Sequence, residues 1–410
     1  MSSVSEVAPS RYTRPFHDRK EIYGENAINH AIEEGRISTI DAKLLRDFVV
    51  ELRATRGISL GRANKIIFTL LTWRHFIGEY RGDSLQDIYR GISRLNDARI
   101  GTKPYKQNTR RDFITFLKRF YRWLISRGLS AIRVDEINAI RAPRRDTMTK
   151  TAEHLLSEDQ IRAMIEACQN SRDRALLAVM YDGGFRLEEM GTLSWGQVKF
   201  DEYGAVINVN EKTQYPRYVR ITASAQFLAA WMNDYPLKIS RDALVFITRA
   251  HQPLEYNGIA KQFKVIARRA GITKHITPHL LRHSRITHMI QRGYNESIVK
   301  KVMWGNLNTT MFSTYVHLTN SDIDHEILSK QGIVEEKVKD SKAMEPKQCV
   351  NCRTINPSTH SFCSRCGQPL SQEVAISMEK IQQEIEETDE FKMVMRLIEE
   401  KLSSKGRAFS

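Results

Sequence analysis

A set of basic residues and one tyrosine in the second half of the chain has the types and spacing needed for chemistry on a phosphate. His279 and Arg282 stand three residues apart, so a helix would place a proton-transfer group and a guanidinium where both reach the same phosphate. Arg186 follows a double glycine and could supply a second guanidinium from another helix. Lys212, in a predicted turn, and the late Tyr315 complete the set.

A second constellation is formed by four of the five cysteines, arranged as two C-x-x-C pairs with ten residues between them: Cys349, Cys352, Cys363 and Cys366. Two such pairs close a tetrahedral thiolate site, the arrangement of a zinc ribbon. Four thiolates leave no open coordination position, so we expect a structural Zn²⁺. Two disulfides would need an oxidising compartment, and a redox C-x-x-C would need only one pair. His360 lies between the pairs and is interpreted as a surface residue.

Composition limits the class of protein and of partner. The 410 residues suffice for two or three domains, and 63 Lys and Arg against 48 Asp and Glu give a net charge of +15. Such an excess is expected of a protein that binds a polyanion, so nucleic acid is the first candidate partner. The apolar runs fall short of the roughly 18 residues of a membrane span, and the polar start lacks the apolar core of a signal peptide. We therefore expect a cytoplasmic protein without membrane association.

More than half of the excess charge lies in residues 103–145, where 12 Lys or Arg face three acidic residues, a net charge of +9. A solvated helix face would mix both signs, so this imbalance favours a phosphate-binding surface. The candidate DNA-binding residues there are Arg110, Arg111, Lys118, Arg119, Arg122, Arg144 and Arg145.

The elements that must position these residues are mostly helices. Apolar stripes predict helices over 39–56, 66–76, 85–92 and 113–124, which form a small all-α domain. After a capping-box pattern at 157–160, further stripes predict helices over 161–168, 173–182 and 257–270 and one through Arg282 and Met289. Alternating residues predict two strands, 205–209 and 218–221, on either side of Lys212. The predicted fold class is mainly α with a small β-sheet (α+β).

Changes in composition divide the chain into segments. We expect a polar leader (1–25), an N-terminal helical domain (26–140), a linker (141–154) and a second domain (155–330). A second linker (331–348) precedes the cysteine-rich ribbon (349–370) and a helical acidic tail (371–410). The tail has a net charge of −3 from 371 on, so we do not expect it to clamp DNA. Two alternatives stay open for its helix: packing on its own chain or on another copy.

The order of these motifs resembles the tyrosine recombinase (integrase) family. The resemblance rests on the G-x-R-x-x-E box at 184–189, the hairpin Lys212, the H-x-L-R-H box at 279–283 and Tyr315 in a Y-x-H-L box. It runs over roughly 155–320, and the basic helical domain before it resembles the core-binding domain of the family. The ribbon is not part of the common recombinase core, so the resemblance says nothing about its role.

The resemblance implies that Tyr315 attacks a scissile DNA phosphate, forming a 3′-phosphotyrosyl link and releasing a 5′-hydroxyl. Arg186 and Arg282 would stabilise the charge of the transition state, and His279 would assist proton transfer at the tyrosine. Lys212 matches the lysine that protonates the leaving oxygen, and Glu189 matches the carboxylate that orients the site. Two guanidiniums supply the stabilisation that nucleases obtain from two metal ions, so catalysis needs no metal, and the covalent intermediate makes ATP unnecessary.

Around the predicted nucleophile the order Met303-Trp304-Gly305-Asn306 departs from the usual glycine followed by histidine or tryptophan. We expect the indole N–H of Trp304 to donate to the phosphate; the alternative is that Trp304 packs behind the site. His283 and His317 are interpreted as supporting or solvent-facing. Asp182 and Glu188 receive no role.

The sequence thus predicts a site-specific DNA recombinase or integrase that binds double-stranded DNA. The resemblance implies a homo-tetramer on two DNA sites, with DNA-bending accessory proteins as further candidate partners. Integration or excision of a mobile element is the first expectation and resolution of chromosome dimers the second. Two other classes stay open: a type IB topoisomerase, which relaxes DNA as a monomer, and a non-catalytic DNA-binding accessory protein.

Overall fold

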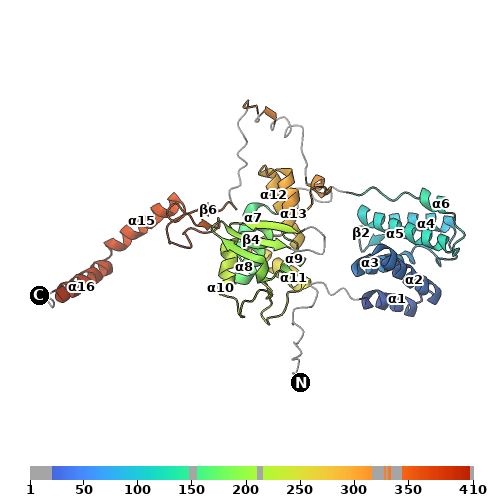
Figure 1. Cartoon of the computed structure of the whole chain (residues 1–410), viewed down its shortest axis with the longest axis horizontal. Helices are drawn as coiled ribbons and strands as arrows, with labels where there is room; N and C mark the ends of the chain where they lie inside the picture. Colours follow the sequence, from blue (N-terminus) through green and yellow to red (C-terminus); the bar gives the residue numbers. More distant parts are fainter. Residues whose placement is uncertain are drawn as a thin grey trace, which may run out of the picture. The chain divides into compact units, whose positions relative to one another are not determined.

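The computed structural model describes residues 21–146, 155–209, 216–315, 327–328, 331–333 and 344–406. They form two compact units, whose boundary falls near residue 150. Helices dominate both units and the sheets are small, which confirms the predicted fold class. Figure 1 labels the elements. No described helix is long and apolar enough to cross a membrane.

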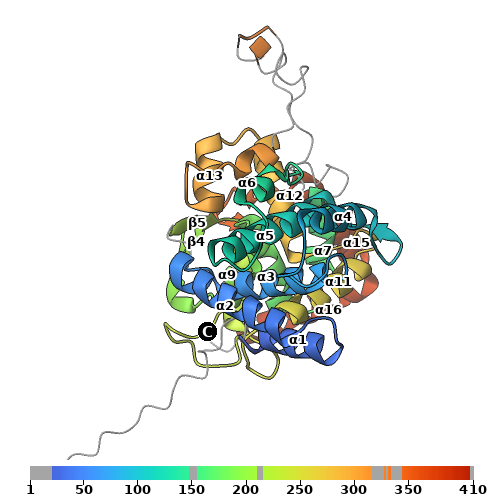
Figure 2. The same cartoon turned by 90° about the vertical axis from the view of Figure 1, so that its right-hand side faces the viewer.

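The N-terminal unit is a bundle of helices (Figure 2). Its helices are α1 Ile22–Glu33, α2 Thr39–Arg56, α3 Leu60–Trp73, α4 Leu85–Asp97, α5 Gln107–Ser126 and α6 Val134–Ala139. A short hairpin, β1 Arg99–Ile100 with β2 Lys103–Pro104, joins α4 to α5. The long helix α5 contacts α3, α4 and α6, so its apolar face forms the centre of the bundle.

Capping residues and an aromatic core explain why these helices begin and pack where they do. Ser38, Ser59 and Ser84 each accept a hydrogen bond from the backbone three residues on, at the starts of α2, α3 and α4. Helix α2 ends at Gly57, which adopts the left-handed conformation that glycine tolerates best. The buried rings of Phe48 and Phe120 meet edge to face in the core.

The second unit places helices around a three-stranded antiparallel sheet. Before the sheet come α7 Glu158–Glu166, α8 Ser171–Asp182, α9 Leu187–Gly191 and the short turn η2 Trp195–Gln197. The sheet consists of β3 Val198–Asp201, β4 Gly204–Val209 and β5 Arg217–Ile221, in the order β3-β4-β5. After it come α10 Ala225–Asn233, α11 Tyr256–Arg269, α12 Pro278–Gln291, α13 Glu296–Trp304 and the turn η3 Met311–Thr314.

The register of the central strand pair decides which side chains face inward. Val209 pairs with Arg217, and Ile207 with Val219. Along β5 the residues 217, 219 and 221 are buried while Tyr218 is exposed. Because side chains alternate between the two faces of a strand, Arg217 belongs to the inward set.

Two apolar clusters of the second unit are relevant to the site. The main core joins α7, α8, β4, β5, α10 and α11. A separate small cluster gathers Ile286 and Met289 of α12, Val299 and Met303 of α13, and Phe312; Trp304 and Tyr315 pack against it. This second cluster therefore fixes α12, α13 and the segment that carries Tyr315 to one another.

The C-terminal part begins with the ribbon, whose predicted range of 349–370 is extended here to 344–371, because β6 starts at Lys347 and Ser371 caps the helix that follows. Its two-residue strands β6 Lys347–Gln348 and β7 Ile355–Asn356 pair antiparallel. It is followed by two helices, α15 Gln372–Glu387 and α16 Asp389–Gly406, which contact each other. Several of their apolar side chains are exposed, among them Ile381 and Ile385 of α15 and Met393 and Leu397 of α16.

Candidate active site

The turn after α8 presents Arg186 at the start of α9. Gly184 has a φ of 58°, a region that favours glycine, and a Cβ there would lie 2.5 Å from the end of the Met303 side chain. Arg186 is the N-cap of α9, and its backbone N–H donates to Glu189 at 2.7 Å. The double glycine and the capping box thus hold Arg186 in one place.

Glu189 is a buried carboxylate that ties two arginines together. Its side chain is only 2% exposed and pairs with Arg186 at 2.8 Å and with Arg217, whose side chain is 1% exposed. Arg217 comes from β5, so Glu189 joins the start of α9 to the sheet. Removing one partner of such a buried ion pair strongly destabilises the folded protein, because the other charge is left buried without a counter-charge.

The C-terminal end of α13 holds two arginines through its free carbonyl groups. Arg217 donates to the carbonyls of Val302 at 2.8 Å and Met303 at 3.0 Å. Arg282 of α12 donates to the same Met303 carbonyl and to that of Gly184. The last carbonyls of a helix lack partners within the helix and carry partial negative charge, so they suit guanidinium groups.

Positive charge is concentrated in this cluster. Burial, followed by the charges of Arg217 and Arg186, lowers the pKa of Arg282 to about 9. The guanidinium remains protonated at neutral pH. Arg186 and Arg217 pair with the Glu189 carboxylate, and Arg282 is held next to Arg217 by the Met303 carbonyl that both bind. Because like charges repel, an added anion such as a phosphate would stabilise the cluster.

Tyr315 lies beside this cluster and is hydrogen-bonded to a histidine. Its hydroxyl pairs with Nδ1 of His283, and the centroids of the two rings lie 5.4 Å apart. The Trp304 ring lies 6.0 Å from the Tyr315 ring and 5.7 Å beneath the Arg282 guanidinium. Burial raises the pKa of Tyr315 to about 12, against a smaller lowering by Arg282, so the hydroxyl needs a base to react at neutral pH.

Of the predicted catalytic set, the structure brings Arg282, Trp304 and Tyr315 together. Arg186 is connected to them through Glu189 and Arg217, which binds the same Met303 carbonyl as Arg282. Lys212 lies outside the described residues, as does His317. His279 occupies the first turn of α12 with an exposed side chain.

Two members of the site, Arg217 and His283, were not predicted from the sequence as catalytic residues. Arg217 is signalled by its inward position in the alternation of β5, where a charged residue needs a buried partner. His283 is signalled by its spacing of four from His279, which places both on one face of α12. Asp182, to which the sequence assigned no role, accepts hydrogen bonds from the Ser224 hydroxyl at 2.7 Å and from the Thr222 backbone at 3.0 Å.

Three of the predicted DNA-binding residues bind the chain itself. Arg111 donates to the Pro143 carbonyl at 2.7 Å, Lys118 to the carbonyls of Asn138 and Ile140, and Arg122 to the Asn138 side chain at 2.7 Å. These contacts attach the segment 138–143 to α5.

Arg119 has a different environment from those three residues. Burial, followed by the charges of Arg56 and Arg62, lowers its pKa. Three cations therefore gather near the N-terminus of α3, where backbone N–H groups point outward. Such a place suits a phosphate. Arg110 donates to Asn96 at 3.3 Å, and Arg144 and Arg145 are exposed.

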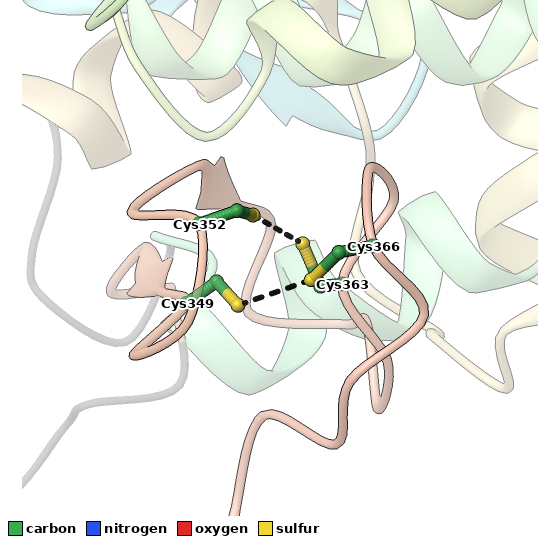
Figure 3. A group of neighbouring side chains, drawn as sticks. All are labelled: Cys349, Cys352, Cys363 and Cys366. Atoms are coloured by element: carbon green, nitrogen blue, oxygen red, sulfur yellow. Dashed lines mark hydrogen bonds between the residues drawn. The ribbon is translucent and has the colours of Figure 1, made fainter.

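The four cysteines of the ribbon converge on one point (Figure 3). All four Sγ atoms lie within 4.8 Å of one another, with 3.6 Å from Cys349 to Cys366 and 3.4 Å from Cys352 to Cys363. These separations exclude disulfide bonds, whose sulfurs are about 2.05 Å apart. The cluster can hold a metal ion.

Known proteins share sequence with the second unit and with much of the chain around it. Residues 154–322 match the phage integrase family. Tyrosine recombinase XerC of Xylella fastidiosa is 27% identical over 299 residues, covering 70% of this chain and 95% of that protein. Tyrosine recombinase XerD of Lacticaseibacillus casei is 27% identical over 298 residues, covering 68% and 95%.

Solved structures share the fold. The Tn1549 transposon integrase, in complex with a circular intermediate DNA, has a TM-score of 0.52 and 15% identity, covering 69% of this chain and 98% of that one. A lambda integrase dimer bound to a core site has a TM-score of 0.52 and 13% identity, covering 67% and 94%. The family match stops at residue 322, so it does not include the ribbon.

Proposed function

We propose that this chain, a site-specific DNA strand-exchange enzyme that carries a phage integrase family domain, cuts and rejoins DNA with Tyr315 as its nucleophile. The Tyr315 oxygen attacks the scissile phosphorus, the bond to the 5′ oxygen breaks, and a 3′-phosphotyrosyl link and a 5′-hydroxyl result. Attack by a 5′-hydroxyl on that link reverses the step, so no ATP is consumed. The observation that carries the proposal is the contact of Tyr315 with His283 and Trp304 beside the Arg282 guanidinium.

Each residue of the cluster has a proposed role. Arg186 and Arg282 bind the non-bridging oxygens, whose charge grows in the transition state. His283 accepts the Tyr315 proton, because their polar atoms are already hydrogen-bonded. Lys212 protonates the leaving 5′ oxygen and His279 assists proton transfer at the tyrosine, as in the tyrosine recombinases that the motifs resemble.

The remaining residues orient those that react. Glu189 and Arg217 hold Arg186 through the buried ion pairs described above. Trp304 has ring contacts with Arg282 and Tyr315, which support a packing role, while its indole N–H also stands as a candidate phosphate donor.

DNA binding by the N-terminal unit is proposed to centre on Arg56, Arg62 and Arg119. Arg62 lies over the Phe116 ring at 4.4 Å, which holds it near Arg119. Arg110, Arg144 and Arg145 extend the basic surface, whereas Arg111, Lys118 and Arg122 attach the segment 138–143 and contribute charge. The two domains proposed from the sequence, 26–140 and 155–330, are kept for this division of labour, with the first limit moved from 26 to 22 so that the N-terminal domain includes all of α1.

The metal of the ribbon is proposed to be Zn²⁺, bound by Cys349, Cys352, Cys363 and Cys366. A tetrahedron with Zn–S bonds of about 2.3 Å places its sulfurs about 3.8 Å apart, close to the separations of 3.6 Å and 3.4 Å between paired sulfurs. Four thiolates complete the coordination, so the ion has a structural role and takes no part in strand cleavage.

We further propose that four copies assemble on two double-stranded DNA sites in the cytoplasm, with DNA-bending proteins as accessory partners. The likeness to XerC, XerD and a transposon integrase supports strand exchange over the alternatives of a monomeric topoisomerase or a non-catalytic DNA-binding protein. Integration or excision of a mobile element is the proposed biological role, with dimer resolution as the second candidate.

Covalent trapping tests the proposed reaction. Wild type and Tyr315→Phe are incubated with nicked DNA drawn from the sequence flanking the gene, and adducts are separated on a denaturing gel. The nick lets a short strand diffuse away, so the enzyme stays attached. We expect an adduct with wild type and with the control Tyr294→Phe, an exposed tyrosine of the same unit, and none with Tyr315→Phe. An adduct with Tyr315→Phe would refute the assignment of the nucleophile.

A further inference from the structure

The ribbon is seated on the catalytic unit through hydrogen bonds and a ring contact. Gln226 of α10 donates to the Ile355 carbonyl at 2.9 Å and accepts from the Ser364 hydroxyl at 3.0 Å. Gln226 therefore contacts the ribbon at two places, between the two cysteine pairs at Ile355 and within the second pair at Ser364. Next to it, the rings of Phe227 and His360 meet at 86° with centroids 5.7 Å apart. Met344, at the start of the ribbon, packs against the main apolar core.

The surface of the ribbon that contacts α10, called the seat below and formed by Ile355, His360 and Ser364, depends on the cysteine cluster for its shape. Asn356 is fully buried, and its side-chain oxygen accepts from the backbone N–H of Ser364 at 2.9 Å. The same oxygen lies 2.9 Å from the Ser364 hydroxyl, so it shares the single hydroxyl proton with Gln226. Ser364 lies directly after Cys363, and it is also the residue that donates to Gln226. A metal that holds the two C-x-x-C pairs together thus holds the surface that contacts α10, since so small a segment has little core of its own.

Next to the ribbon, an ion pair connects α8, which precedes the turn to Arg186, with α12, which carries Arg282. A small cavity is lined by Ser358 and Thr359 of the ribbon and by Asp182 and Arg285 of the catalytic unit. Asp182 and Arg285 pair at 3.3 Å, with side chains 14% and 13% exposed. Asp182 is the last residue of α8, and Arg285 lies on α12.

These two residues lie close in sequence to the reacting arginines. Asp182 precedes Arg186 by four residues, across the Gly183-Gly184 turn, and Arg285 follows Arg282 by one turn of α12. Asp182 also fixes the backbone of Thr222 and Ser224, which leads into α10 and its Gln226. A continuous set of contacts therefore runs from the ribbon through α10 to the end of α8 and the middle of α12.

We propose that the metal-bound ribbon acts as a positioning element for the catalytic arginines: by seating on α10 it holds the Asp182–Arg285 pair, which in turn fixes Arg186 and Arg282. Asp182 and Arg285 are positioning residues and do not touch the substrate. The inference rests on the proposed function for its consequence in catalysis, but the structural coupling can be measured without any reaction.

Hydrogen exchange on the full-length protein tests the coupling. Backbone exchange in 171–191 and 278–291 is compared between the Zn²⁺-loaded protein, the protein after chelation, and the protein reloaded with Zn²⁺. Loss of the seat should make both segments exchange about tenfold faster, and reloading should reverse the change. Faster exchange confined to 344–371 would show that the ribbon is an independent module and would overturn the proposal.

Gln226→Ala separates the seat from the metal, because it removes both hydrogen bonds to the ribbon and leaves the cysteines intact. The matched control is Gln382→Ala on α15, whose side chain donates to Glu386 of the same helix. We expect one Zn²⁺ per chain in both variants and faster exchange in 278–291 only in Gln226→Ala. Equal exchange in the two variants would contradict the proposed seat.

A kinetic split distinguishes positioning from general loss of structure. With Gln226→Ala, the Kd for nicked DNA should stay within about twofold of wild type while single-turnover cleavage falls about tenfold. A rise in Kd with unchanged cleavage would assign the ribbon to DNA binding and refute the positioning role. If wild type itself forms no adduct, the proposed function fails, and the exchange measurements still decide whether the ribbon holds the arginines.

Discussion

Replacing Glu189 by glutamine should destabilise the catalytic unit strongly, because it leaves a buried arginine without its counter-charge. Glu189 and Arg217 have side chains only 2% and 1% exposed. Removing one partner of such a pair typically costs about 3–5 kcal/mol, and the lower end applies here because two carbonyls still bind Arg217. We therefore expect a loss of about 3 kcal/mol, or a population of unfolded catalytic unit about 150-fold higher.

The assay is pulse proteolysis across a urea gradient, with the catalytic-unit fragment followed on a gel so that the N-terminal unit does not enter the measurement. Glu188→Gln is the matched control, since Glu188 is the adjacent, exposed acid and should change stability by less than about 0.5 kcal/mol. The double variant Glu189→Gln with Arg217→Met should recover part of the loss, because it removes both charges. A loss below about 1 kcal/mol in Glu189→Gln would refute the reasoning that this pair is buried and mutually dependent.

Three further predictions concern the nucleophile, the turn before Arg186 and the basic surface. In His283→Ala, the logarithm of the cleavage rate should rise with pH with a slope of about 1 between about pH 6.5 and 8, below the pKa of Arg282, because the ionised fraction of a tyrosine with a pKa of about 12 grows tenfold per unit. In wild type the base should flatten that slope, and identical slopes in the two proteins would exclude His283 as the base. Gly184→Ala should lower the free energy of unfolding, measured by thermal unfolding, by at least about 2 kcal/mol. The control Gly271→Ala should lower it by about 1 kcal/mol, because Gly271 has a φ of 70° but open space around it. Equal losses in the two variants would contradict the close approach of Met303 to Gly184. Arg62→Ala should reduce the slope of log K against log salt for DNA binding by about 0.9 per lost phosphate contact, and an unchanged slope would place the DNA elsewhere.

Helices with a clear apolar face could be predicted from the sequence, and so could two of the three strands in the catalytic sheet. The predicted strands 205–209 and 218–221 lie within β4 and β5. The first strand, Val198–Asp201, could not be recognised because it is short and none of its residues is fully buried, so it lacks the alternation of a half-buried strand.

The residues of the candidate site that belong to sequence motifs could be predicted. Those whose environment depends on how distant segments pack together could not. Arg186, Arg282 and Tyr315 could be named from their spacing, and the structure gathers them. Arg217 was missed because the predicted strand 218–221 began one residue after it and an arginine on a strand is usually exposed, although it continues the alternation of the buried Val219 and Ile221. Similarly, the attachment of Arg111 and Lys118 to the segment 138–143 depends on how that segment folds back along α5, which local sequence does not encode.

The end of α13 limits how separately the parts of this enzyme can be redesigned. The Met303 carbonyl binds both Arg217 and Arg282, and the same helix leads within twelve residues to Tyr315. An engineer who shifts the nucleophile segment to reach a different phosphate would therefore also shift two guanidinium anchors. The nucleophile and the arginines therefore have to be kept or replaced together.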